Sequence, residues 1–225
     1  QYMTHPEEWT YHIPEGMTTM EGALVEPAAV GMHAAVLGGA QPGKSIVILG
    51  GGTIGLMVLQ ACISLGATDI TVVDVIEKRL ELAKKLGAAR VINGKEEDTV
   101  AVLRSEEMYG DHGVDLVFEA AGAVFTAQQA VQIVSRGGKI MMVGTQSKPV
   151  PIDFLKINRE VTIQTSFRYC NNFPQTIEAI SSGRFNVKDM VTNIYDYEDV
   201  QKAFEEAIDP VKKTEMVKGV IKVAE

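Results

Sequence analysis

One short segment constrains this chain more than any other, the glycine-rich run Gly50-Gly51-Gly52-Thr53-Ile54-Gly55. It follows an apolar stretch, Ser45–Leu49, and opens a helical pattern, Thr53–Leu65. A G-x-G-x-x-G turn between a strand and a helix is typical of domains that bind a dinucleotide, whereas glycine clusters elsewhere often mark plain turns. The strand-turn-helix context favours the binding role over the plain turn.

Each glycine of such a turn has its own role. Gly50 permits the tight bend, Gly52 lets the backbone approach a pyrophosphate, and Gly55 lets the helix lie close to the strand. The phosphates then meet free N–H groups at the positive end of the helix dipole. The sequence therefore predicts a phosphate-binding site at this turn.

Short β-branched runs alternate with helical patterns from Ser45 onward, as βαβ units do. The predicted strands are Ser45–Leu49, Ile70–Asp74, Arg90–Ile92, Val114–Glu119, Lys139–Val143 and Val161–Ser166. The predicted helices between them are Thr53–Leu65, Glu77–Leu86, Glu96–Tyr109, Ala123–Val134 and Ile152–Asn158, with C-cap glycines expected at Gly66, Gly87, Gly110 and Gly137. The expected fold is α/β, with a six-stranded, doubly wound parallel sheet of the Rossmann type.

The flanks follow a different pattern. Residues 1–44 predict a loop and then a helical stretch from Thr19 to about Val36. After Tyr169, helices are expected at Pro174–Gly183 and Glu198–Ile208, with extended segments at Val191–Tyr195 and Val217–Val223. The last strand has no place on a sheet of six, so we expect it to pair outside this chain or with the first residues.

Asp74 ends the second predicted strand, 22 positions beyond Gly52, where a dinucleotide fold places the acid that receives the ribose hydroxyls. A carboxylate there repels a 2′-phosphate, which favours NAD over NADP. A strand-end Asp that caps the next helix is the alternative. Arg79 is expected to lie over the adenine or to hydrogen-bond the ribose. Taken alone, it could almost equally be a solvent-exposed arginine in the first turn of a helix.

Two further segments leave strands at the edge where ligands bind in open α/β sheets. Val143-Gly144-Thr145 follows the fifth strand, and Ser166-Phe167-Arg168-Tyr169 follows the sixth. Arg168 and Tyr169 offer donors suited to a polyhydroxylated substrate. From the residues alone, Tyr169 could equally belong to a substrate-binding site or lie on a surface without a function.

Glu26 is the one carboxylate in the otherwise apolar stretch from Glu26 to Ala34. A buried carboxylate needs a partner, so Glu26 is expected to serve a metal, a metal-bound water or a proton relay. An acid at a helix start, with Pro27 opening the helix, fits equally well. His33, like His5, His12 and His112, shows no metal spacing and is expected to be structural or solvated.

Composition limits the partners. The net charge of −8 has no basic block, so nucleic-acid binding is not expected, and no apolar run is long enough to cross a bilayer. Cys62 and Cys170 are too few for a disulfide framework, and the first residues do not form a signal peptide, so a cytoplasmic setting is expected. The chain does not begin with Met, which suggests that it is cut from something longer.

These landmarks together resemble the medium-chain dehydrogenase/reductase superfamily, and within it the sorbitol (polyol) dehydrogenases. The resemblance runs over essentially the whole chain. Its specific pieces are Glu21-Gly22-Ala23-Leu24-Val25-Glu26-Pro27 and, more sharply, Phe167-Arg168-Tyr169-Cys170-Asn171. The resemblance implies an NAD-dependent, zinc-type oxidation of a secondary alcohol of a sorbitol- or xylitol-like polyol to a ketose, in a homo-oligomer such as a tetramer.

The resemblance also implies roles for residues and segments. Ile54, Asp74, Arg79, Val143 to Thr145 and Ser166 to Arg168 would line the NAD site, and Glu26, Arg168 and Tyr169 would contact the polyol or its zinc-bound water. Residues 1–29 and 172–225 would be remnants of a GroES-like catalytic domain, and 30–171 the NAD-binding domain. Because the segment that supplies the zinc ligands is not found here, zinc is expected only in the intact protein, and this chain is expected to bind NAD(H) with little or no activity.

Two other functions are compatible with the sequence. A zinc-free, quinone-reductase-like oxidoreductase would use NADPH, and Asp74 and Glu26 both count against it. A non-catalytic NAD-binding module is a second alternative. In either case the predicted ligand is a small molecule.

Overall fold

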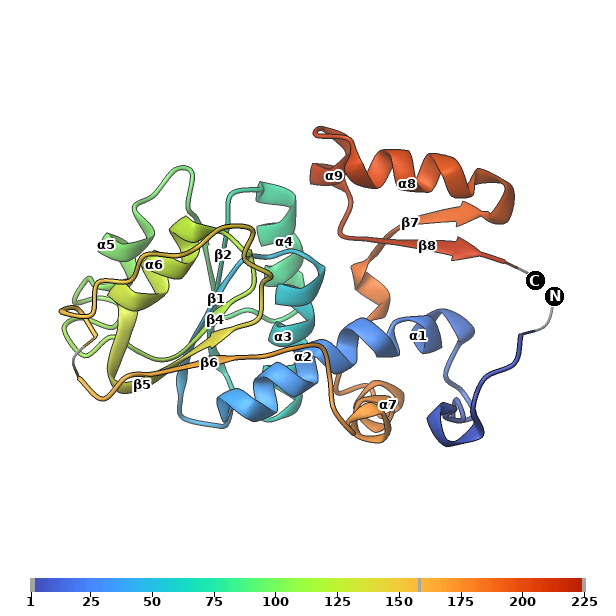
Figure 1. Ribbon diagram of the computed structural model, residues 1–225, viewed down its shortest axis with the longest axis horizontal. Coiled ribbons are helices and arrows are strands. Elements are labelled where there is room, and N and C mark those ends of the chain that lie inside the picture. Colours follow the sequence, from blue (N-terminus) through green and yellow to red (C-terminus); the bar gives the residue numbers. More distant parts are fainter. Residues whose placement is uncertain (1–2, 158, 224–225) are drawn as a thin grey trace.

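The computed structural model describes residues 3–157 and 159–223, and its centre is a six-stranded parallel sheet (Figure 1). The strand order is β3-β2-β1-β4-β5-β6, which confirms the predicted doubly wound α/β fold. The strands are β1 (Ser45–Leu49), β2 (Asp69–Asp74), β3 (Arg90–Asn93), β4 (Val114–Glu119), β5 (Val134–Met142) and β6 (Thr162–Thr165). The order reverses between β1 and β4, which marks the edge where ligands of such sheets bind.

Helices cover both faces of this sheet. One face carries α2 (Val25–Gly38), α3 (Thr53–Ser64) and α4 (Glu77–Lys85), and the other carries α5 (Thr99–Leu103) and α6 (Val124–Ile133). Strand β1 is apolar after Ser45 because it faces two cores: Ile46 and Ile48 pack into the first, while Val47 and Leu49 pack into the second. The central strands are therefore buried on both sides.

The N-terminal flank folds as predicted. After a short 3-10 helix, Glu7–Trp9, helix α1 (Thr19–Ala23) leads through Leu24 into α2. The Thr18 hydroxyl accepts a hydrogen bond from the Glu21 amide, and the Glu21 carboxylate accepts one from the Thr18 amide. This capping box fixes the start of the helical stretch.

The C-terminal flank forms a small α/β unit beside the main sheet (Figure 1). It contains α7 (Phe173–Ser181), β7 (Val191–Asp196), α8 (Val200–Ile208), α9 (Lys212–Glu215) and β8 (Lys218–Lys222), with 3-10 turns at Lys188–Met190 and Tyr197–Asp199. Strand β8 pairs in parallel with β7, so the expected pairing outside the chain or with the first residues is wrong. Residues of α7 and the segment to Met190 pack into the same core as α2 and α3.

Two predicted helices differ clearly from the structure. The stretch 96–109 forms only α5: the Asp98 side chain accepts from Val100 N and Ala101 N and so starts the helix at Thr99, and after Leu103 the chain continues in turns. The helix expected at Ile152–Asn158 is a series of turns, in which the Asp153 carboxylate accepts from Leu155 N; Asn158 itself lies outside the described residues.

A smaller difference lies at the junction of α6 and β5. Val134 pairs with Val114 as the first residue of β5, so the predicted helix ends one residue early. Gly137 has a φ of +67° within β5 and donates its amide to the Arg159 carbonyl, so it is not a helix cap. Gly66 and Gly87 do follow their helices with positive φ, as predicted.

No helix of the described residues is both long enough and apolar enough to cross a membrane.

Candidate functional site

The glycine turn joins β1 to α3, and its three predicted positions differ in the space around them. Gly50 has a φ of +111°, and a side chain there would meet the Ala121 amide nitrogen at 2.9 Å. A Cβ at Gly55 would lie 1.8 Å from the Gly50 carbonyl oxygen. At Gly52, in contrast, the nearest atom to a Cβ is 3.9 Å away. Gly50 and Gly55 are therefore required by the fold, whereas Gly52 leaves space open above the turn.

Asp74 is tied to this turn. Its Oδ2 accepts a hydrogen bond of 2.6 Å from the Gly51 amide, and its Oδ1 accepts from Val75 N at 2.7 Å and Ile76 N at 2.9 Å. The carboxylate does not cap α4, whose N-cap residue is Ile76 and has no side-chain cap. Asp74 thus holds the ends of β1 and β2 together at the carboxyl edge of the sheet.

Arg79, in the first turn of α4, lies beside Asp74. Its Nη1 is 3.7 Å from Asp74 Oδ2, and its buried Nε has no hydrogen-bond partner among the described residues. Its Nη2 donates to the Lys213 carbonyl at 3.4 Å. An unpaired buried donor is costly, so Arg79 has capacity for a further acceptor.

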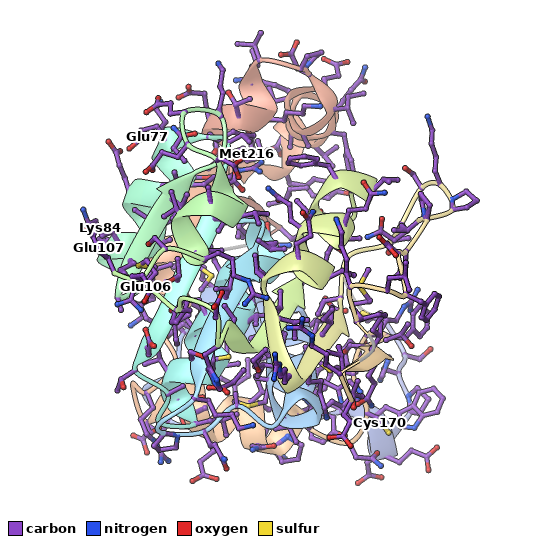
Figure 2. The ribbon with its side chains drawn as sticks, turned by 90° about the vertical axis from the view of Figure 1, so that its left-hand side faces the viewer. Glu77, Lys84, Glu106, Glu107, Cys170 and Met216 are labelled. Atoms are coloured by element: carbon purple, nitrogen blue, oxygen red, sulfur yellow. The ribbon has the colours of Figure 1, made fainter. Side chains whose placement is uncertain are left out.

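The C-terminal unit reaches this end of the sheet. The Thr53 hydroxyl donates to the Val217 carbonyl, and Lys78 forms an ion pair with Glu215. Figure 2 shows Glu77 and Met216 in the upper part of the molecule and Cys170 near its bottom. The start of α3 and the start of α4 are thus both in contact with the segment before β8.

A cleft of about 470 Å³ lies over the turn, at the switch point between β1 and β4. It is lined by Gly50, Gly52, Val73, Asp74, Val75, Arg79, Gly94, Thr99, Ala120, Ala121, Ala123, Phe125, Thr126 and Gln129. Four of the predicted cofactor residues, Gly50, Gly52, Asp74 and Arg79, are in this set. The Thr99 hydroxyl, like Arg79 Nε, is buried without a partner among the described residues.

The other predicted cofactor residues lie elsewhere along the same edge. Ile54 and Gly55 are in the first turn of α3, Val143, Gly144 and Thr145 follow β5, and Ser166, Phe167 and Arg168 follow β6; none lines the cleft. The buried Ser166 Oγ has no partner among the described residues. Their positions agree with an extended ligand that runs along the strand ends, and their contact with one remains a prediction.

The residues predicted for catalysis are not brought together. Glu26 is exposed in the first turn of α2, so the expectation that it is buried is wrong for the described chain, and the helix-start interpretation fits its position. Arg168 is exposed at a φ of +52°, with its guanidinium 5.5 Å from the centre of the Phe167 ring. No hydrogen bond or ion pair within residues 3–157 and 159–223 joins Glu26 to Arg168 or Tyr169.

Tyr169 lines a second hollow of about 470 Å³, which is predominantly aromatic. Its ring packs edge-on against Phe173 at 4.9 Å, and Tyr11 stacks on the same Phe173 at 5.4 Å. The lining residues are His5, Trp9, Tyr11, Tyr169, Cys170, Asn171 and Phe173. The N-terminal flank thus meets the segment after β6, which sequence spacing did not indicate.

Sequence reasoning missed several residues at this edge, among them Glu119, the last residue of β4. It is completely buried, and its Oε1 accepts from Ala121 N at 3.1 Å, Gly122 N at 2.9 Å and the Thr126 hydroxyl at 2.7 Å. Its Oε2 accepts from Gln146 Nε2 at 2.7 Å. One signal was available: a carboxylate at the end of an apolar parallel strand, directly beside the switch point.

The described residues do not supply a metal site. No group of three or more His, Cys, Asp or Glu side chains among them is placed to hold a metal ion.

The strand order, the glycine turn and the cleft define a Rossmann-type α/β protein. The family model described as zinc-binding dehydrogenase matches residues 53–182. The chain therefore belongs to the zinc-binding dehydrogenase family.

Three relatives illustrate the likeness. An uncharacterized zinc-type alcohol dehydrogenase-like protein of Escherichia coli (strain K12) is 62% identical over 224 residues, covering 100% of this chain and 63% of that protein. Sorbitol dehydrogenase of Bacillus subtilis (strain 168) is 39% identical over 211 residues, covering 92% and 59%. The crystal structure of an Escherichia coli oxidoreductase/dehydrogenase of unknown specificity superposes with a TM-score of 0.94 at 62% identity, covering 98% and 62%. The chain thus spans about three fifths of the length of these relatives.

Proposed function

We propose that this chain is the cofactor-binding part of an NAD-dependent polyol dehydrogenase. The observation that carries the proposal is the arrangement of the glycine turn and Asp74 at one cleft, with the Gly51 amide 2.6 Å from the Asp74 carboxylate. The open space above Gly52 and the unpaired Arg79 Nε fit a bound phosphate or ribose. Sorbitol dehydrogenase of Bacillus subtilis, among the relatives, supports the substrate class.

The chain's own residues have distinct roles in this proposal. The amides at the start of α3 bind the pyrophosphate, because the N-terminus of a helix presents unpaired N–H groups and a positive dipole end. Asp74 accepts hydrogen bonds from the ribose hydroxyls, and its negative charge disfavours a 2′-phosphate. NAD, when bound, supplies the ring that accepts or donates the hydride.

The substrate end of the site is proposed at the residues after β6. Tyr169 offers a phenol within an aromatic hollow, and Arg168 offers a planar set of donors next to it. Zinc, where the intact protein uses it, would be held by residues other than those described. We therefore propose that these 225 residues bind NAD(H) but do not turn over a polyol by themselves; zinc-dependent oxidation of sorbitol by the purified chain would contradict this.

Cofactor choice gives the sharpest test. Dissociation constants for NAD⁺ and NADP⁺ are measured on the purified chain, on Asp74→Ala and on Asp69→Asn, a control at the opposite end of the same strand. We expect at least a tenfold preference for NAD⁺, about 1.4 kcal/mol, that Asp74→Ala reduces and Asp69→Asn retains. Equal affinity, or a preference for NADP⁺, would favour the quinone-reductase-like alternative and contradict the proposal.

Self-association is part of the same proposal. Strand β6 is an edge strand, and its Ile163 is 37% exposed. An uncovered edge favours pairing with a second copy. Light scattering should therefore show a mass above that of one chain, and a monomer at micromolar concentration would contradict this point.

A further inference from the structure

Gln129, in helix α6, is a buried polar residue whose side-chain amide has no protein partner. The residue is only 6% exposed, and within residues 3–157 and 159–223 its amide group forms no hydrogen bond. Burying a side-chain amide without a hydrogen bond costs free energy, so such groups normally face a ligand or an ordered water. The amide oxygen and nitrogen of Gln129 are therefore available to a bound molecule.

Gln129 lines the same cleft as the glycine turn and Asp74. Thr99, at the start of α5, lines it too, and its buried hydroxyl has no partner among the described residues. Gln128 differs from its neighbour, because it donates to the Pro151 carbonyl at 3.2 Å and lines a separate hollow. The cleft thus combines the turn and Asp74 with two unpaired polar groups from α5 and α6.

The ribose assigned to Asp74 determines what occupies the rest of the cleft. It is the ribose that carries the 2′-phosphate in NADP, so it belongs to the adenosine half of the cofactor. Its 5′ carbon leads through the phosphates to the start of α3, so the base on its 1′ carbon extends in another direction. The lining that the turn and Asp74 do not provide comes from the ends of β2 and β3, the loop after β4, and helices α5 and α6.

This remaining lining has the composition of a site for a flat ring with a polar edge. Val75 and Phe125 both line the cleft, although they are 59% and 65% exposed. Apolar and aromatic side chains suit the faces of a base, and a few polar groups suit its edge. The amide of Gln129 matches adenine in particular, because glutamine can accept from the 6-amine and donate to a neighbouring ring nitrogen.

We propose that Gln129 is a specificity-determining residue that hydrogen-bonds the polar edge of the adenine base. The inference rests on the proposed function, since it assumes that the cleft binds the adenosine half of a nicotinamide dinucleotide. Each edge of adenine that a glutamine amide can pair with includes the 6-amine. A base whose 6-amine has no hydrogen to donate should therefore lose this interaction.

The test compares NAD⁺ with nicotinamide 1,N⁶-ethenoadenine dinucleotide, in which a two-carbon bridge leaves the 6-nitrogen without a hydrogen. Calorimetric titration gives both dissociation constants for the wild type and for Gln129→Met. Methionine is unbranched and similar in length to glutamine, so the steric effect of the bridge is the same in both proteins. We expect the preference for NAD⁺ over the etheno derivative to fall roughly tenfold in Gln129→Met, the effect of leaving one polar edge unpaired.

Gln128→Met is the matched control, because it makes the same substitution at the adjacent residue, whose amide faces the other hollow. It should leave the ratio of the two affinities unchanged. Gln129→Met should also unfold at a guanidinium chloride concentration no lower than that of the wild type, because an apolar side chain replaces an unpaired amide. A clear loss of stability would show that the amide has a structural partner, and would overturn the inference.

The binding outcomes are distinct. If Gln129→Met keeps the wild-type ratio, its amide faces only water, and if it weakens both ligands equally, its role is merely structural; either result overturns the inference. If the wild-type chain binds neither NAD⁺ nor the etheno derivative, the proposed function itself fails.

Discussion

Two glycines in the same turn should respond to alanine in opposite ways. At Gly55 a Cβ would lie 1.8 Å from the Gly50 carbonyl oxygen, whereas ordinary contacts begin at 3.4 Å, so helix and turn must separate by about 1.6 Å (3.4 − 1.8). Both sides of that contact are backbone and cannot rotate away. Overpacking of this kind costs about 1–3 kcal/mol. We expect Gly55→Ala to lower the free energy of unfolding by about 3 kcal/mol, the upper end of this range.

At Gly52 the fold makes no such demand. The φ is −73°, which Ala adopts freely, and the nearest atom is 3.9 Å away. Loss of a glycine N-cap should cost about 0.5–1 kcal/mol. The new methyl group would, however, occupy the space through which a diphosphate approaches the α3 amides. We expect Gly52→Ala to weaken NADH binding at least tenfold, about 1.4 kcal/mol.

Guanidinium chloride unfolding and NADH fluorescence titration separate the two effects. Gly52→Ala should unfold nearly as the wild type does and bind poorly, and Gly55→Ala should unfold at a clearly lower denaturant concentration. Wild-type affinity of Gly52→Ala for NADH would show that no diphosphate approaches the turn at Gly52. Wild-type stability of Gly55→Ala would show that the fold does not require a glycine there.

Two further predictions concern stability. Gly31→Ala would place a Cβ 2.4 Å from the Met57 carbonyl carbon where α2 crosses α3, and it should cost about 1–3 kcal/mol in denaturant unfolding; no loss would show that the two helices can separate. Burial raises the pKa of Asp115, but hydrogen bonds from the Ser45 amide and hydroxyl oppose and outweigh this effect, so the net pKa is below the ordinary value. Asp115 therefore contributes stability above about pH 4 that is lost as the pH falls through its folded-state pKa. Asp115→Asn should lower the free energy of unfolding by about 1 kcal/mol at pH 7 and by progressively less as the pH falls. A loss of stability that does not change with pH would contradict the lowered pKa of Asp115.

The sheet was predictable because its signals are local. Strand β1 is apolar at consecutive positions that face two cores, and the glycines after α3 and α4 mark the ends of those helices. The turn at Gly50 and the acid at Asp74 lie at a fixed spacing, and the structure brings both to one cleft. Short-range pattern and chain geometry are sufficient for these elements.

The errors come from contacts that no local pattern encodes. The helix expected at 96–109 begins later because the side chain of Asp98 caps it at Thr99, and it ends at Leu103. Arg104, just beyond α5, donates to the Gln132 and Val134 carbonyls. Strand β8 finds its partner β7 across two intervening helices. Pairing at that separation depends on how α8 packs, which periodicity does not determine.

The candidate site was predictable only in part for the same reason. Glu119 has no distinguishing neighbour in sequence, and its fourth donor, Gln146, is 27 positions away. Glu26 looked buried because its neighbours are apolar, yet it lies on the exposed side of α2. Burial of a single helical residue depends on which face turns inward, and one carboxylate among small apolar residues does not indicate this.

In the proposed function, the turn after β1 and the acid at the end of β2 together bind a nicotinamide dinucleotide. Isothermal titration of the purified chain with NADH tests it most directly. We expect saturable heat with one site per chain that NAD⁺ competes for and that Asp74→Ala weakens. A flat titration with both NADH and NAD⁺, on protein whose circular dichroism shows the folded state, would contradict the account.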